Sequence, residues 1–143
     1  MSAAPLGRAW LAGHLPHRGT MSLLDEITAW DAATVRAVAR GHRSPDHPLR
    51  RAGMLPIAAG IEYGAQAAAA HGALAAGRPA AAGMLASVRS VVFHADRLDD
   101  VAGNLEVVAE QVGAGPGGVV YRFGIFAAGR ALVEGRVAVA FAP

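Results

Sequence analysis

The longest apolar segment of the chain, residues 55–76, has the composition of a buried helix. Alanine, the strongest helix former, fills most of it, Pro56 suits its first turn and Gly77 suits its end. Because the segment is apolar nearly all the way round, it must be buried on most sides, as it would be inside a wrapped sheet. Gly60 and Gly64 share one face, which predicts close packing of that sheet on the helix.

Alternating apolar and polar residues predict strands in much of the rest of the chain. After Gly83 the pattern is of strands throughout. The clearest strands are expected at residues 34–40, 103–112, 119–126 and 131–141. Turns are expected at residues 113–118 and Gly129. A short helix, an extended stretch and a loop are expected at residues 5–13, 15–27 and 41–53. These elements predict one α+β domain, residues 1–143, with long antiparallel strands around one Ala-rich helix.

The composition is strongly apolar, with 53% hydrophobic residues and a mean hydropathy of +0.32. A bilayer span needs about 20 residues with few or no charges. Residues 55–76 contain Glu62, Gln66 and His71, so we expect no membrane span. The first residues lack the basic start and apolar run of a signal peptide. Cysteine is absent, which excludes disulfides and thiol nucleophiles and favours a cytoplasmic location.

The basic residues are all arginines, 13 in number, and the net charge is only +2. They are scattered from Arg8 to Arg136 instead of clustering with aromatic residues. Nucleic-acid binding is therefore not expected.

Glu62 is the one carboxylate within the apolar helix, and Gln66 lies one turn further on the same face. A carboxylate is costly to bury without a partner, and in apolar surroundings its pKa rises, so that it can act as a general acid. The alternative is that Glu62 faces solvent or caps a backbone group. His71 lies about 180° round the helix from Glu62 and is a separate feature.

Six histidines are candidate bases, because histidine titrates near neutral pH. They are His14, His17, His42, His47, His71 and His94. His14 and His17 are three residues apart, but no cysteine or close carboxylate pair completes a metal shell, so no metal or other cofactor is expected. The chain also lacks the GxSxG motif of a serine hydrolase.

Two segments, LPHRGTMSLLDEI near the start and LPIAAGIEYGAQA on the helix, resemble the dehydratases of 3-hydroxyacyl thioesters on acyl carrier protein. In that family a proline precedes a Glu-x-x-x-Gln motif by six residues, and Pro56, Glu62 and Gln66 match this spacing. Residues 85–100 resemble the family's next strand and turn, and residues 135–141 its closing strand. The resemblance implies the hotdog fold, in which a long sheet wraps around the central helix.

The chain departs from the mainstream family in the loop before the helix. That family has a catalytic histidine in a His-Phe-Pro-Gly loop 14 residues before the glutamate, where this chain has Pro48, with His47 one residue earlier. The chain is closer to the aryl-polyene branch, which keeps the histidine of LPH. The resemblance thus implies His17 as base and Glu62 as acid, with His47 as a rival base. Alternatively, His17 fastens the N-terminal loop and His47 lies on a solvated surface.

The implied reaction removes the C2 proton of a 3-hydroxyacyl thioester and expels the 3-hydroxyl as water, leaving a trans-2-enoyl thioester. Gln66 would hold Glu62 or a water, and Ser87 would supply one N–H to the thioester oxygen. Further N–H donors are expected at the start of the helix, at Ile57, Ala58 and Gly60. An acyl tunnel would be lined by Ile61, Leu85 and Val88.

The resemblance also implies partners. In the family the two reacting side chains come from different subunits, so a homodimer, a higher homo-oligomer or a heterodimer with another hotdog subunit is expected. The substrate would be carried by acyl carrier protein or coenzyme A. Arg50 and Arg51 are candidates for the carrier's phosphate or acidic surface, or are an ordinary solvated pair. A hotdog thioesterase, with Glu62 activating water, and a non-catalytic acyl-binding or heterodimer-partner subunit are the alternative functions.

Overall fold

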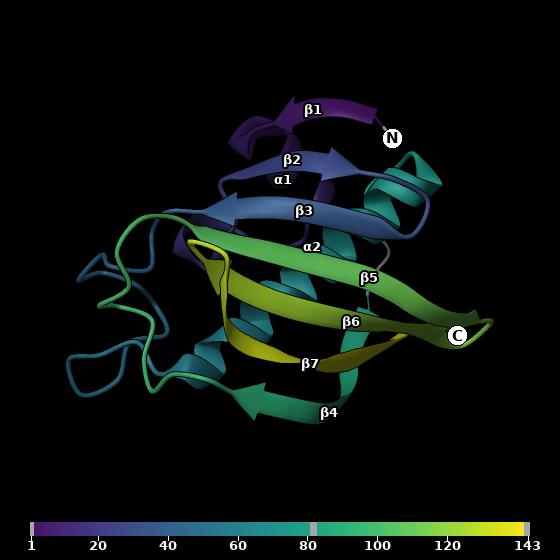
Figure 1. Ribbon diagram of the computed structural model, residues 1–143. Helices are drawn as coiled ribbons and strands as arrows, with labels where there is room; N and C mark the ends of the chain where they lie inside the picture. Colours follow the sequence, from purple (N-terminus) through teal and green to yellow (C-terminus); the bar gives the residue numbers. More distant parts are fainter. Residues whose placement is uncertain (1, 81–82, 142–143) are drawn as a thin grey trace.

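The computed structural model describes residues 2–80 and 83–141. Seven strands form one antiparallel sheet with the order β1-β2-β3-β5-β6-β7-β4, so that β1 and β4 lie at its two edges (Figure 1). The strands are β1 (Ser2–Leu6), β2 (Glu26–Trp30), β3 (Thr34–Ala39), β4 (Gly83–Phe93), β5 (Leu105–Gly115), β6 (Gly118–Ala127) and β7 (Arg130–Phe141). The helices are α1 (Arg8–His14), the 3-10 turns η1 (Gly19–Met21) and η2 (Ile57–Ala59), and α2 (Gly60–Ala76).

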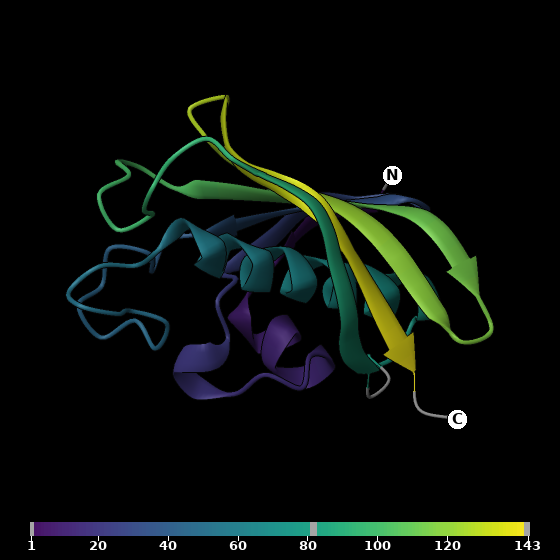
Figure 2. The same cartoon turned by 90° about the horizontal axis from the view of Figure 1, so that it is seen from below.

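The sheet curves around α2, which lies along its concave side (Figure 2). Glycines on α2 allow this close packing. A Cβ on Gly60 would lie 2.6 Å from Cγ1 of Val133, and one on Gly64 would lie 2.5 Å from the ring of Phe123. The structure confirms the predicted α+β fold, a long antiparallel sheet wrapped around one Ala-rich helix.

The other side of α2 is covered by the N-terminal segment that contains α1 and η1 (Figure 2). Leu11, Leu15, Leu23 and Leu24 of this segment are buried in the core. Because the covering segment includes His17, the fold brings the LPHR motif to the side of α2 that faces away from the sheet. Among the described residues, no helix is long and apolar enough to cross a bilayer.

The observed elements differ from the predicted ones at their ends. Strand β1 was not predicted, and α1 spans Arg8–His14 instead of residues 5–13. The helical segment begins at Ile57, not at residue 55, because the Leu55 carbonyl accepts the Leu98 N–H from another segment. The predicted turn at residues 113–118 is also too long. β5 continues to Gly115, which pairs with Gly118, so only Pro116 and Gly117 lie between the strands.

Candidate active site

His17 and Glu62 of the same chain lie side by side. His17 follows α1, Glu62 lies in the first turn of α2, and His17 Nε2 is 3.5 Å from Glu62 Oε1. Both side chains are partly accessible, with 25% of His17 and 33% of Glu62 exposed. The pair is therefore reachable from solvent. The other ring nitrogen of His17, Nδ1, is buried and has no hydrogen-bond partner among the described residues.

Gln66 fastens the segment after His17 to the helix and also contacts Glu62. Its Oε1 accepts the Leu23 N–H at 3.0 Å, and its Nε2 donates to the Met21 carbonyl at 2.7 Å. The same Nε2 lies 3.4 Å from Glu62 Oε1. Gln66 is fully buried, so its side-chain oxygen and nitrogen cannot bind water. The contacts with Leu23 and Met21 satisfy both groups instead. The expected contact between Gln66 and Glu62 is present, and both contacts to Glu62 are made to Oε1.

The electrostatics of Glu62 differ from those expected of a carboxyl among apolar groups. The hydrogen bond from His17 lowers the pKa of Glu62 below its ordinary value, with a further contribution from Gln66, and together they outweigh the desolvation that would raise it. The prediction of a raised pKa is therefore wrong. It considered the apolar composition of the helix, whereas the neighbours that decide the pKa come from the N-terminal segment.

The same contact corrects the expectation that the two reacting side chains come from different subunits. His17 and Glu62 meet within one chain. The acid and the base proposed from the sequence therefore form a pair within one chain. Their pairing no longer requires a dimer.

His47 is buried, with 8% of its surface exposed, and both its ring nitrogens are occupied. Nδ1 accepts the Leu49 N–H at 3.1 Å, and Nε2 lies 2.8 Å from Tyr63 Oη. Burial lowers the pKa of His47. The interpretation of His47 as a solvated surface residue is thus wrong, and it has no nitrogen available as a base. Tyr63, its partner on α2, was missed; the available signal was a single tyrosine beside Glu62 in a helix of small residues.

The other histidines have partners away from the His17–Glu62 pair. Hydrogen bonds join His14 to the Trp10 carbonyl, His42 to the Val101 carbonyl, His71 to Tyr121, and His94 to Glu134. Within the described residues, no group of three or more His, Asp or Glu side chains could hold a metal ion.

The start of the helical segment has fewer free N–H groups than expected. The Ile57 N–H donates to the Asp96 carbonyl at 3.1 Å, and the Ala59 and Gly60 N–H groups donate to carbonyls of their own turn. Ala58 is exposed, and its N–H has no backbone acceptor among the described residues. Ile57 and Gly60 are therefore wrong as oxyanion donors, and Ala58 stays a candidate.

The expected tunnel residues lie on or near edge strand β4. Leu85 and Val88 are 43% and 38% exposed, and Ser87 follows a bulge in the pairing of β4 with β7. Ile61 is half-buried on α2. Their roles in substrate binding stay predictions.

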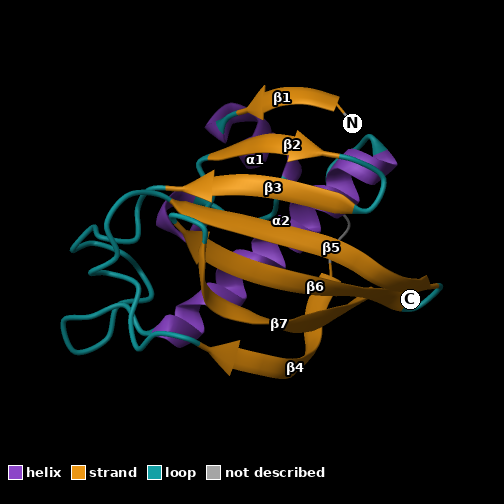
Figure 3. Cartoon of the chain, in the orientation of Figure 1, coloured by secondary structure: helices purple, strands orange, loops and turns teal. Residues whose placement is uncertain are grey.

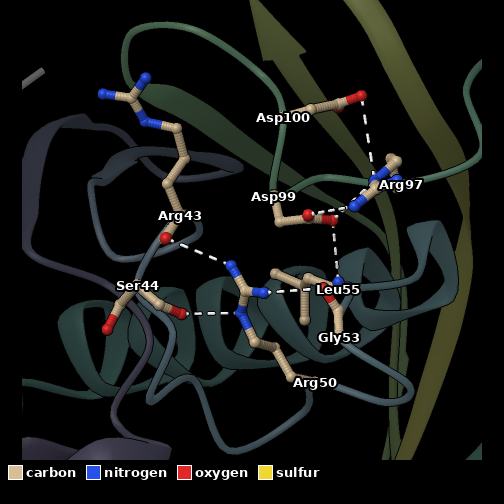
Figure 4. A network of polar contacts seen from close by, with 8 residues as sticks. All are labelled: Arg43, Ser44, Arg50, Gly53, Leu55, Arg97, Asp99 and Asp100. Atoms are coloured by element: carbon tan, nitrogen blue, oxygen red, sulfur yellow. Dashed lines mark hydrogen bonds and ion pairs between the residues drawn. The ribbon is translucent and has the colours of Figure 1, made fainter.

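Arg50 is occupied by the loop that carries it (Figure 4). Its guanidinium donates to three backbone carbonyls, those of Ser44, Gly53 and Arg43, at 2.8, 3.0 and 3.2 Å. These contacts show that Arg50 braces residues 43–53, and binding of the carrier by its remaining N–H groups stays a prediction. Arg51 is exposed, and a role for it in carrier binding stays a prediction.

The start of α2 is held by the turn after β4 (Figure 4). Asp99 accepts the Leu55 N–H at 2.9 Å and two hydrogen bonds from Arg97, which hold the pKa of Asp99 well below its usual range. The loops that carry Arg50 and Asp99 gather at one end of the sheet, where α2 begins (Figure 3).

Comparison with known proteins identifies the family. The sequence profile of the ApeP-like family, described as ApeP dehydratase, matches residues 10–143. The chain belongs to the ApeP-like dehydratase family. The matched residues include both His17 and Glu62, and the family agrees with the aryl-polyene branch that the two motifs resemble. No curated protein sequence matched the chain.

Solved structures show the same fold. The dehydratase heterocomplex ApeI:P from Xenorhabdus doucetiae superimposes with a TM-score of 0.78 at 21% identity, covering 99% of this chain and 93% of the other. AziG from S. sahachiroi gives 0.61 at 21% identity, covering 85% and 91%. The thioesterase HI1161 from Haemophilus influenzae gives 0.59 at 14% identity, covering 80% and 76%. The hotdog fold is thereby confirmed.

Proposed function

We propose that this ApeP-like dehydratase converts 3-hydroxyacyl thioesters, carried by acyl carrier protein, into trans-2-enoyl thioesters during the assembly of a polyene. The observation that carries the proposal is the pairing of His17 and Glu62, 3.5 Å apart, in a chain whose family is one of dehydratases. Coenzyme A is the alternative carrier, and a cytoplasmic location stays a prediction from the sequence.

The elimination needs a base for the C2 proton and an acid for the 3-hydroxyl. In the proposed reaction His17 Nε2 takes the proton from C2, and the electron pair of that C–H bond forms the C2–C3 double bond. The C3–O bond breaks as Glu62 gives its proton to the hydroxyl, which leaves as water.

The reaction needs one proton on the pair beforehand, carried by the Glu62 carboxyl, with His17 Nε2 free to accept. The lowered pKa of Glu62 favours its carboxylate form, so Glu62 has to take up a proton before each elimination. After the elimination His17 Nε2 holds the C2 proton and Glu62 has lost its own, so transfer of that proton from His17 to Glu62 restores the reacting form.

The thioester oxygen gains negative charge as the C2 proton leaves, and N–H donors would stabilise it. The Ala58 N–H is the candidate from the helix start, since it lies at the positive end of α2 and has no backbone acceptor among the described residues. Ser87 on β4 is the second candidate.

A second hotdog chain is the proposed protein partner. Four large apolar residues of edge strand β4 are strongly exposed: Leu85, Val88, Val92 and Phe93. An exposed apolar row on a sheet edge is typical of a protein interface. The structure of the ApeI:P heterocomplex, to which the chain is similar, supports a partner of the same fold.

The function is tested by incubating the purified protein with trans-2-enoyl and 3-hydroxyacyl thioesters on acyl carrier protein. Hydration, its reverse and release of free thiol are followed together. We expect interconversion of the two acyl groups without thiol release. Rapid thiol release without hydration would support the thioesterase alternative, for which the fold of HI1161 is a precedent. Acyl binding without either reaction, alone and with a second hotdog subunit, would indicate a non-catalytic subunit.

A further inference from the structure

A cavity of about 270 Å³ lies next to the catalytic pair but does not include it. Its wall is built from Arg8 of α1, the segment that follows His17, the loop after β3, and Tyr63 of α2. The polar side chains that line it are Arg8, Thr20, Ser22, Ser44, Asp46, His47 and Tyr63. We call it the Tyr63 cavity. The mechanism proposed above leaves its polar groups unused.

The hydrogen bonds of His47 decide which way the Tyr63 hydroxyl donates. The Leu49 amide can only donate, so His47 Nδ1, 3.1 Å away, must accept and carries no proton. A neutral His47 therefore has its proton on Nε2, which donates to Tyr63 Oη at 2.8 Å. Protonation of Nδ1 would set two donors against each other, and burial also disfavours the charged ring.

Tyr63 consequently has to donate its own proton elsewhere. Tyr63 is 1% exposed, and among the described residues its hydroxyl has no partner other than His47. Burial raises the pKa of Tyr63, so the hydroxyl keeps its proton. A buried donor without an acceptor is costly, and the cavity that Tyr63 lines is where an acceptor can reach it.

The charges around the cavity indicate an uncharged acceptor. Arg8 is the cationic side chain among the lining residues, and its Nε is bonded to Asp25 Oδ1 at 2.8 Å. Its Nη1 donates to the Ser22 carbonyl at 3.2 Å. Asp46 adds a carboxylate to the wall. An anionic ligand would meet a cation that is already neutralised, whereas a carbonyl or hydroxyl oxygen needs only the donor that Tyr63 offers.

We propose that Tyr63, positioned by His47, binds an uncharged acceptor oxygen of the thioester substrate at a point away from the reacting carbons. The substrate class rests on the proposed function. Tyr63 directly follows Glu62, and the cavity wall at Gly19 and Thr20 comes just after His17, so a thioester at the pair has another part within reach of the cavity. Two parts of a thioester have such an oxygen away from the reacting carbons: an oxygenated far end of the acyl group, and the outer amide of the pantetheine arm, which N-acetylcysteamine lacks.

The test compares Tyr63→Phe, which removes only the hydroxyl, with the wild type on four trans-2-enoyl thioesters. Two acyl chains of equal length, with and without a terminal hydroxyl, are each attached to pantetheine and to the shorter N-acetylcysteamine. We expect Tyr63→Phe to raise KM about 3- to 10-fold, the loss of one neutral hydrogen bond, with little change in kcat. A rise confined to the hydroxylated chains identifies the acyl end, and one confined to the pantetheine thioesters identifies the carrier arm.

Tyr121→Phe is the matched control, because Tyr121 is equally buried and also bonded to a histidine, His71, at 2.7 Å. It should leave the KM ratios among the four thioesters unchanged. His47→Gln, which retains a donor to Tyr63, should behave as the wild type, and His47→Ala should reproduce Tyr63→Phe. The same KM ratios in Tyr63→Phe as in the wild type would overturn the proposal.

Failure of the proposed function would look different, because the wild type would then hydrate none of the four thioesters. The same comparison is then made as Kd by calorimetry, with the saturated thioesters as probes. Weaker binding by Tyr63→Phe of the thioesters with the terminal hydroxyl, or of those with the pantetheine arm, would still support the Tyr63 site. An unchanged Kd for all four would reject it.

Discussion

At the scale of single residues, the proposed chemistry depends on the short distance between His17 and Glu62 and on Gln66 behind them. A carboxylic acid in an apolar pocket keeps its proton because burial raises its pKa. Glu62 follows another arrangement, since the His17 imidazole beside it lowers its pKa. His17 therefore has two functions in the proposed mechanism: it removes the C2 proton and reloads the acid.

The arrangement predicts the titration of Glu62. In the wild type its carboxyl carbon, followed by NMR, should titrate below 4.5, the ordinary pKa, because the ionised form is stabilised by His17. His17→Asn removes the largest cause and should move the pKa upward. Asp31 is an internal control, because its pKa is lowered by the backbone N–H groups of Ala33 and Thr34 and should not change. A wild-type Glu62 that titrates above 4.5 would contradict this picture.

The same shift has a consequence for stability. A carboxyl whose pKa is lowered on folding stabilises the native state at pH values above its unfolded pKa. This contribution is lost as the pH falls through the folded pKa of Glu62. The free energy of unfolding of the wild type, relative to Glu62→Gln, should therefore decrease below pH 4.5. A difference that grew toward acid pH would show the opposite shift.

At the scale of elements, the two faces of α2 carry different kinds of residue. Small residues face the sheet, which approaches the helix backbone closely at Gly60 and Gly64. Polar residues Glu62 and Gln66 face the N-terminal segment, where their hydrogen-bond partners lie. The helix therefore packs against the sheet on one side and carries the proposed reacting groups on the other.

Two glycines of α2 should respond oppositely to alanine. A Cβ on Gly64 would lie 2.5 Å from ring atoms of Phe123, so Gly64→Ala should destabilise the protein by about 1–3 kcal/mol through overpacking. Gly72 has no atom within 4 Å of the same position, and Gly72→Ala should stabilise it by up to about 1 kcal/mol through helix propensity. Chemical denaturation measures both, and equal effects would contradict the close packing at Gly64.

Periodicity predicted the main elements because they are local: the Ala-rich helix and the alternating strands are visible in short windows of sequence. The errors at the ends of elements, and the missed strand β1, come from tertiary contacts. Leu55 is held outside the helix by Leu98 and Asp99, and β1 exists because β2 offers it an edge.

The residues of the candidate site were predictable in part. The two motifs, through their resemblance to a family, singled out His17, Glu62 and Gln66. The meeting of His17 with Glu62 in one chain was not predictable, since it depends on how Gln66 holds the segment from Met21 to Leu23. The hydrogen bond from the Ile57 N–H to the Asp96 carbonyl, and that between His47 and Tyr63, likewise join separate segments of the chain.

At the scale of the whole molecule, the edges of the sheet differ. β4 presents an exposed apolar row at one edge, and the proposed hotdog partner would cover it. Val92→Asp, at a residue 51% exposed, should reduce the assembly to a smaller species because it puts a charge into that interface. Val112→Asp on β5, at a residue 39% exposed, is the control and should leave the assembly intact. Light scattering after size exclusion measures both, and an unchanged mass for Val92→Asp would exclude this surface.

The central claim is that His17 and Glu62 act together as the catalytic pair of a dehydratase. The most direct test is kcat for hydration of a trans-2-enoyl thioester by four proteins: the wild type, His17→Asn, Glu62→Gln and the double variant, each shown to be folded. Groups that act as a unit lose most of the rate on the first substitution. We predict a loss of about 100-fold or more in each single variant and little further loss in the double variant. Single variants that retain wild-type kcat, or losses that multiply in the double variant, would contradict the account.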